Sequence, residues 1–226
     1  MTYKSLTKQL IYILVFTFFT TINFAQTQQR ETLQEGDLLF QNLKCGALCD
    51  AIKAVTNGID GKQFAHCAMV VKINDTLKVV EAIGNQVQAN SLYNFFKRSG
   101  DTSVIENITI ARLKNEYKKF IAKASAFAKK QVGKPYDDEF IMNNEKWYCS
   151  ELLYEAYKVA NNKKDFFTLA PMTFKDPKTN NFFSAWVDYY KDLQKPIPEG
   201  KLGINPGLIS RSKKIDVLKI DKVKLD

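Results

Sequence analysis

Hydrophobic and polar positions along the chain predict an α+β domain. Short apolar runs bounded by turn residues are typical of strands, and they occur at 36–41, 64–73, 77–83 and 104–113. Asn74-Asp75 is placed to form a hairpin turn between the second and third of these runs. The C-terminal stretch, 211–226, supplies either a final strand at 215–218 or a basic tail.

Apolar residues at helical spacing predict helices between the strands. These helices cover 45–56, 92–96, 115–132, 184–193 and a segment that starts at or beside Cys149 and extends past Tyr157. The rest of 86–100 is expected to be a connector. Residues 161–207, rich in aromatic residues, Asn and Pro, are expected to form a loop-rich cover around one short helix.

The helix that starts at Cys149 gives this thiol a possible chemical role. Backbone N–H groups in the first turn of a helix lack intrahelical partners, and a cysteine at that end has a lowered pKa and a larger thiolate fraction. The same N–H groups can stabilise an oxyanion. The alternative is a buried structural cysteine, because cysteine is among the most often buried residue types.

The predicted hairpin supplies a base and a carboxylate. His66 is the only histidine in the chain. Strand alternation places on one face Phe64, His66, Ala68 and Val70. A turn at 74–75 puts Glu81 diagonal to His66 on the returning strand, within reach of its side chain.

Cys149, His66 and Glu81 therefore form a minimal set of nucleophile, base and orienting group. Two structural alternatives stay open. His66 could be a core histidine bonded to a backbone carbonyl, and Glu81 could be a surface charge at a strand edge. Apolar neighbours indicate that Glu81 is partly buried, and a buried carboxylate is costly unless it is paired.

The first 25 of the 226 residues differ from the remainder. Lys4 and Lys8 precede an apolar run at 10–19 that is short for a membrane span, which predicts a signal peptide over 1–25. A polar leader follows at 26–35, and 36–226 form one domain. We therefore expect export to the periplasm or the medium; the alternative is an uncleaved N-terminal membrane anchor.

The chain carries a formal net charge of +9. Its basic residues form no stripe interleaved with aromatic residues, so we expect a solvated surface and no nucleic-acid partner. Peripheral association with anionic envelope polymers is a weaker possibility. Cys45 and Cys49 are four positions apart, which suits a local disulfide and two free thiols equally well. One histidine and these cysteine spacings argue against a zinc site, and we expect no metal and no cofactor.

Five short motifs occur in a fixed order: 36–40 (GDLLF), 65–71 (AHCAMVV), 80–82 (VEA), 133–137 (GKPYD) and 148–152 (YCSEL). Together they resemble the permuted papain-like amidases of the YiiX and YaeF type, which are relatives of the NlpC-type cell-wall cysteine peptidases. The resemblance runs from about Gly36 to Tyr157, with weaker support to Phe174. It implies a circularly permuted papain-like (NlpC-type) fold, with an antiparallel sheet or partial barrel packed against the nucleophile helix.

The resemblance also implies residue roles. It makes Cys149 the nucleophile, His66 the base and Glu81 the third polar residue.

Further residues match the same motifs. Tyr148, Ser150 and Tyr136 are expected to line the oxyanion or substrate site, and Asp37 to fix the loop near the histidine strand. Cys67 departs from the family, which more often has a small or aliphatic residue there. Alternation directs Cys67 to the face opposite His66, so we expect it to have little bearing on the site.

The function implied by the resemblance is an exported cysteine hydrolase that cleaves an amide through a thioester on Cys149. Peptides, isopeptides and peptidoglycan fragments such as murein stem peptides are the expected substrates. One alternative is acyl transfer to or from lipids or acyl esters, as in related permuted folds of the lecithin retinol acyltransferase type; the aromatic segment 166–190 could supply an apolar groove. A non-catalytic envelope-binding module is the other.

Overall fold

The computed structural model describes residues 32–100 and 107–220. The chain divides into two compact units, and all described residues belong to the second, Glu31–Asp226. The predicted signal peptide at 1–25, most of the polar leader and positions 104–106 lie outside the described residues. Within the described ranges, no helix is long and apolar enough to cross a membrane.

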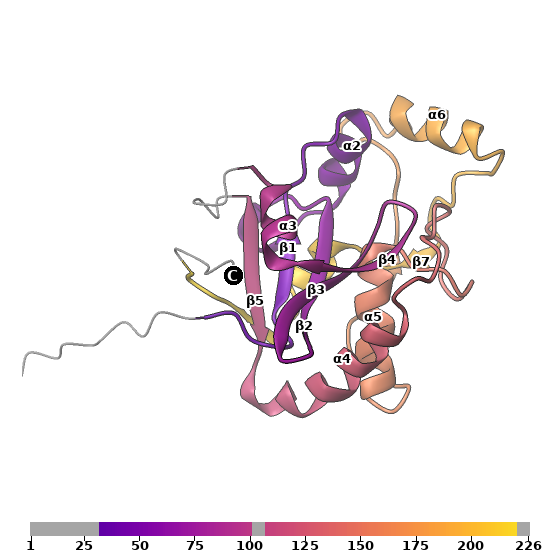
Figure 1. The fold of residues 1–226 in the computed structure, drawn as a ribbon. Helices are drawn as coiled ribbons and strands as arrows, with labels where there is room; N and C mark the ends of the chain where they lie inside the picture. The colour runs from indigo at the N-terminus through magenta and orange to yellow at the C-terminus, as the bar shows by residue number, and fades with distance from the viewer. Residues whose placement is uncertain (1–31, 101–106, 221–226) are drawn as a thin grey trace, which may run out of the picture. The chain divides into compact units, whose positions relative to one another are not determined.

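A six-stranded antiparallel sheet forms the centre of the described unit (Figure 1). Its strand order is β4-β3-β2-β1-β5-β8. The strands are β1 (Leu38–Gln41), β2 (His66–Ile73), β3 (Thr76–Ile83), β4 (Gln86–Ser91), β5 (Ile108–Leu113) and β8 (Ile215–Val217). The mixed α+β class and the antiparallel sheet are thus confirmed, and β8 supports a final strand near 215–218.

The prediction of a connector at 86–91 is wrong, because these residues form the edge strand β4. It pairs with β3 from Ile83↔Gln86 to Lys78↔Ser91. Val87 is its one fully buried side chain. An edge strand tolerates a polar sequence because one side of its backbone faces solvent, so hydrophobicity did not reveal it.

The β2–β3 hairpin turns where it was predicted. Asn74 and Asp75 have positive φ of 46° and 60°, as a two-residue hairpin turn requires. The register pairs Met69 with Val80, and continuing it places Glu81 diagonal to His66, as predicted.

The prediction that Phe64 shares a face of the sheet with His66, Ala68 and Val70 is wrong. Regular alternation starts only at His66, and Phe64 instead packs beside Phe40, with ring centroids 5.4 Å apart. Both rings belong to the apolar cluster on the opposite side of the sheet.

Helices cover both faces of the sheet. On one face α5 (Cys149–Ala160) packs against β2 and β3, and α4 (Ile121–Lys130) packs against α5 and β2. The contacting faces of the sheet and of these helices bury apolar residues that include Cys67, Met69, Leu152, Leu153 and Tyr157. Burial of each large aliphatic side chain stabilises the fold by about 1.5–3 kcal/mol. On the other face α3 (Leu92–Lys97) buries Leu92, Phe95 and Phe96.

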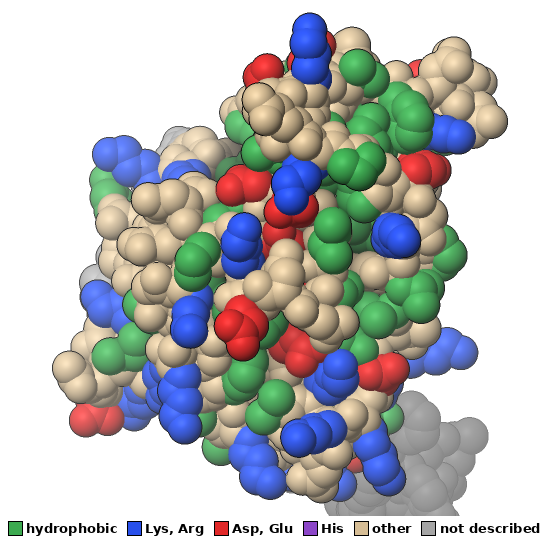
Figure 2. Space-filling model, turned by 90° about the vertical axis from the view of Figure 1, so that its right-hand side faces the viewer, with side chains coloured by type: hydrophobic (Ala, Val, Ile, Leu, Met, Phe, Trp, Pro, Cys, Tyr) green, Lys and Arg blue, Asp and Glu red, His purple; other side chains and the backbone are tan. Residues whose placement is uncertain are grey.

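The helix predicted at 115–132 begins differently. Its first part is a 3₁₀ helix, η2 (Asn115–Phe120), and α4 ends at Lys130. The exposed side chains of these two elements include Lys118, Lys119, Lys123 and Lys130. Figure 2 shows Lys and Arg side chains gathered at the lower end of the molecule, the level at which Figure 1 places α4.

Six further elements complete the fold of the described residues. They are α2 (Ala47–Val55), η1 (Ile59–Gly61), β6 (Ala170–Pro171), α6 (Ser184–Asp192), β7 (Leu202–Gly203) and α7 (Pro206–Ser210). α2 packs against α6, and a disulfide joins Cys45 to Cys49 with their Cα atoms 5.3 Å apart. The structure therefore favours the disulfide over two free thiols. The predicted cover at 161–207 contains its helix, to which the structure adds a two-stranded sheet and α7.

Candidate active site

Cys149 is the first residue of α5, as predicted. Tyr148 caps the helix with extended backbone angles, φ −90° and ψ 165°. The Glu151 carboxyl, three residues into the helix, accepts the backbone N–H of Tyr148 and that of Asn143, the latter at 3.1 Å. Burial raises the pKa of Glu151 to about 8. These two hydrogen bonds hold the loop before the helix and so help to fix the position of Cys149.

Ser150 also anchors the N-terminus of α5. Its hydroxyl donates a hydrogen bond of 2.9 Å to the carbonyl of Ile204, just after β7. The Tyr148 hydroxyl accepts the Ile204 N–H at 3.3 Å and donates to Met142 Sδ at 3.1 Å. Both hydroxyls are therefore engaged in anchoring the start of α5.

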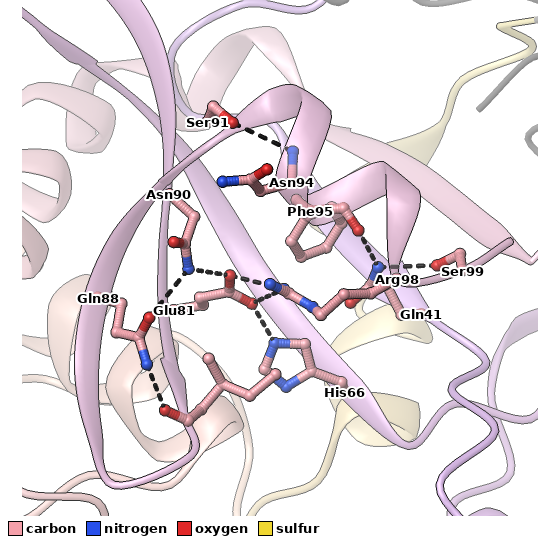
Figure 3. A network of polar contacts seen from close by, with 11 residues as sticks. Gln41, His66, Glu81, Gln88, Asn90, Ser91, Asn94, Phe95, Arg98 and Ser99 are labelled. Atoms are coloured by element: carbon pink, nitrogen blue, oxygen red, sulfur yellow. Dashed lines mark hydrogen bonds and ion pairs between the residues drawn. The ribbon is translucent and has the colours of Figure 1, made fainter. Parts of the chain in front are cut away.

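His66 and Glu81 meet on the sheet. His66 Nε2 lies 2.6 Å from Glu81 Oε2 (Figure 3), and both side chains are buried. Burial alone would raise the pKa of Glu81, but its hydrogen bond with His66 and the charges of His66 and Arg98 outweigh burial and lower that pKa. The carboxylate therefore occupies Nε2 and leaves Nδ1 of the ring for another partner.

That partner is Cys149. Burial lowers the pKa of His66, but hydrogen bonds with Cys149 and Glu81 outweigh it and raise the pKa to about 9. The pKa of Cys149 is lowered, first by a hydrogen bond from the Cys67 thiol and then, against the effect of burial, by His66. The structure thus brings the three predicted residues together, and their electrostatics favour a thiolate–imidazolium pair.

The expectation that Cys67 has little bearing on the site is wrong. Alternation does direct it away from His66, but that face of the sheet is the one α5 covers. Hydrogen bonding from the Cys67 thiol and backbone N–H lowers the pKa of Cys149. Burial and this neighbouring thiolate raise the pKa of Cys67, so Cys67 stays protonated and acts as a donor.

Sequence reasoning also missed two partners of Glu81. Arg98, just after α3, places Nη2 2.6 Å from Oε1 and 2.5 Å from Oε2. Asn90, on β4, donates from Nδ2 to Oε1 at 2.8 Å. No motif marked either residue, because both belong to the segment that was expected to be a connector.

A cavity that is partly open to solvent lies at Cys149. Its wall is formed by Ile52, Val55, Thr56, Ala65, Tyr136, Phe140, Tyr148, Cys149, Ser150, Met172, Thr173, Phe174, Trp186, Ile204, Asn205 and Pro206. None of these described residues carries a charged side chain apart from the thiol itself. The cavity therefore suits an uncharged group next to the nucleophile.

The three residues expected to line the site, Tyr136, Tyr148 and Ser150, all lie on this wall. Burial, and then the charge of Cys149, raise the pKa of Tyr136 well above its usual range. Its hydroxyl thus stays protonated near the thiol and is available as a donor.

Asp37 lies away from the cavity wall and has structural contacts. Its fully buried carboxylate accepts Arg112 Nε at 2.7 Å and the Gln34 N–H at 2.8 Å. Its backbone carbonyl accepts the Val70 N–H at 2.8 Å. These bonds join the start of β1 to β2 and β5, next to the histidine strand.

Proteins of the YiiX type are among those that the chain resembles. The Uncharacterized protein YiiX of Escherichia coli strain K12 is 28% identical over 127 residues, which cover 56% of this chain and 58% of that protein. The crystal structure of metalloprotein YiiX from E. coli O157:H7 has a TM-score of 0.67 and 20% identity, and the match covers 85% of this chain and 99% of that one. Among the residues described here, no group of three or more His, Cys, Asp or Glu side chains is placed to hold a metal ion.

A family model extends the match over most of the chain. It is described as the permuted papain-like amidase enzyme, YaeF/YiiX, C92 family, and it matches residues 32–218. In the present fold the histidine strand β2 precedes the cysteine helix α5, the order that the sequence resemblance implied. The chain belongs to the permuted papain-like amidase family of the YaeF/YiiX type.

Proposed function

We propose that the protein is a cysteine hydrolase that cleaves an amide bond through a thioester on Cys149. The observation that carries this proposal is the position of Cys149, at the N-terminus of α5 and bonded to an imidazole that Glu81 holds. A nucleophile, a base and an orienting carboxylate in this arrangement are the parts that covalent acyl transfer requires.

In the first half of the reaction, the Cys149 thiolate attacks the carbonyl carbon of the substrate. The backbone N–H of Cys149, at the free end of α5, donates to the oxygen that becomes negative. The His66 imidazolium then gives its Nδ1 proton to the leaving nitrogen as the C–N bond breaks. The products of this half are an amine and a thioester on Cys149.

In the second half, water attacks the thioester. Neutral His66 removes a proton from this water, and the C–S bond breaks to release a carboxylic acid. The proton stays on His66 and the thiolate returns to Cys149, so the ion pair is restored. Glu81 keeps Nε2 occupied throughout and thereby keeps Nδ1 directed at the sulfur.

The substrates that we propose are peptides or isopeptides, with peptidoglycan stem peptides as the first candidate. The relationship to cell-wall peptidases and the signal peptide predicted at 1–25 support an exported enzyme of this kind. The exposed lysines of α4 and η2 would favour peripheral contact with anionic envelope polymers.

A second candidate is hydrolysis or transfer of an acyl ester. The cavity supports it, because its wall is largely apolar and includes two aromatic side chains of the segment 166–190, Phe174 and Trp186. A non-catalytic binding module is the third possibility, and it predicts that Cys149→Ser retains any cellular effect of the protein.

The test incubates wild type and Cys149→Ala with purified murein fragments, small peptide amides and fatty-acyl esters, with products read by mass spectrometry. We expect wild type to release an amine and an acid from an amide, and Cys149→Ala to release neither. Release from esters alone would favour the second candidate. Equal release by both proteins would contradict catalysis by Cys149.

A further inference from the structure

We infer that Arg98 is a positioning residue, which holds the Glu81 carboxylate ionised and in the orientation that supports His66. The inference rests on the proposed function and extends the site from three side chains to a fourth. Arg98 contacts both carboxylate oxygens of Glu81, so it is placed to act through Glu81.

The contacts of Glu81 carry this inference. Its side chain has no exposed surface, and Figure 3 shows it between Asn90, Arg98 and His66. Arg98 Nη2 reaches both carboxylate oxygens, at 2.6 and 2.5 Å. One oxygen also accepts Asn90 and the other meets His66 at 2.6 Å. Each carboxylate oxygen thus has two partners, and Arg98 is the one partner shared by both.

The buried Glu81 carboxylate needs a neighbouring cation that stays charged throughout the reaction. A buried carboxylate without compensating charge takes up a proton, and a protonated Glu81 would no longer stabilise an imidazolium. His66 cannot provide the compensation alone, because its proton moves during catalysis. Arginine stays charged throughout, so Arg98 keeps Glu81 anionic when His66 is neutral.

The helix that ends just before Arg98, α3, is fixed at both ends. At its start, the Ser91 hydroxyl accepts the Asn94 N–H at 3.1 Å. At its end, Gln41 Nε2 on β1 donates to the Phe95 carbonyl and to Ser99 Oγ, both at 2.8 Å. The Arg98 guanidinium lies over the buried Phe95 ring, 5.2 Å from its centroid. The cation is therefore held in place by the fold, although 30% of its side chain is exposed.

Loss of the Arg98 charge should raise the pKa of Cys149. The other titratable groups around the His66–Glu81 pair are Cys149 from α5 and Cys67 from β2. Loss of the cation lets Glu81 take up a proton, which weakens the imidazolium and raises the pKa of Cys149. Direct loss of a nearby positive charge would also raise it. Only the first route requires a carboxylate at position 81, and this difference separates the two.

The experiment measures the pH dependence of Cys149 alkylation by iodoacetamide, with the modified peptide quantified by mass. We expect Arg98→Met to move the midpoint upward by about one pH unit, which slows alkylation about tenfold below the midpoint. Arg98→Lys should restore part of the shift. Lys97→Met removes an exposed cation at the same helix end, close to the Tyr93 ring, and should leave the midpoint unchanged. In a Glu81→Gln background, Arg98→Met should produce no further shift.

Thermal unfolding of each variant shows whether it is folded, and Arg98→Gln replaces Arg98→Met if the latter is not. The inference is overturned if the neutral variant keeps the wild-type midpoint, or if its shift is as large in the Glu81→Gln background. A wild-type Cys149 that reacts no faster than free cysteine would overturn the proposed function as well. If Cys149 reacts faster than free cysteine but the Arg98 variants leave its alkylation midpoint unchanged, only the inference is overturned and the proposed function stands.

Discussion

Removal of the Cys149 thiol should lower the pKa of His66. In the folded protein, burial lowers this pKa, but hydrogen bonds with Cys149 and Glu81 raise it from 6.5 to about 9. That difference corresponds to about 3 kcal/mol in favour of the imidazolium. Of the two bonds, the one to Cys149 raises the pKa more. In Cys149→Ala, burial then opposes Glu81 alone, and we expect the midpoint to fall by about two pH units.

The assay is a proton NMR titration of the imidazole C2–H resonance. His66 is the only histidine, so a protein without a histidine tag gives one such signal. Wild type should keep the imidazolium up to about pH 9, because a raised pKa means that the proton is lost only at higher pH. Cys149→Ser, which carries no anion at neutral pH, should behave like Cys149→Ala. A wild-type midpoint near 6.5, or the same midpoint in all three proteins, would refute the ion pair.

Three further substitutions test other contacts. Cys67→Ala should raise the pKa of Cys149 and slow its alkylation at pH 6 by about tenfold, whereas Cys67→Ser keeps a hydrogen-bond donor and should keep most of the rate. Identical alkylation rates in wild type and Cys67→Ala would argue against the thiol–thiol hydrogen bond. Leu153→Ala, at a fully buried position, should lower the free energy of unfolding in urea by about 2–5 kcal/mol, and a loss below about 1 kcal/mol would contradict the packing of α5. Gly36→Ala should destabilise more than Gly133→Ala in the same assay: both glycines have positive φ, but only at Gly36 would a new Cβ meet Ile121, 2.6 Å from its Cγ2. Equal losses would mean that the contact with Ile121 relaxes without cost.

Local chemistry was enough to predict how His66 meets Glu81. The turn at Asn74-Asp75 fixes the hairpin register, and the register fixes which side chains are diagonal neighbours. The start of α5 was equally predictable, since the apolar period begins at Cys149 and turn residues precede it. These features depend on residues close together in sequence.

The contacts of Cys67 and Arg98 depend on how the elements pack. Alternation placed Cys67 on a face of the sheet, but no pattern in the strand says which helix covers that face. Arg98 follows a helix of six residues after a polar edge strand, and neither element has enough periodicity to predict that it folds over Glu81. Residues that support a site across elements therefore emerged only from the structure.

An acyl-enzyme on Cys149 would test the proposed nucleophile most directly. Wild type is mixed with a small acyl p-nitroanilide, quenched in acid within the first turnover, digested and analysed by mass spectrometry. We expect the mass of one acyl group on the peptide that contains Cys149, its removal by hydroxylamine, and no label in Cys149→Ala. Release of nitroaniline with the acyl group on another residue, or at an equal rate in Cys149→Ala, would contradict the mechanism.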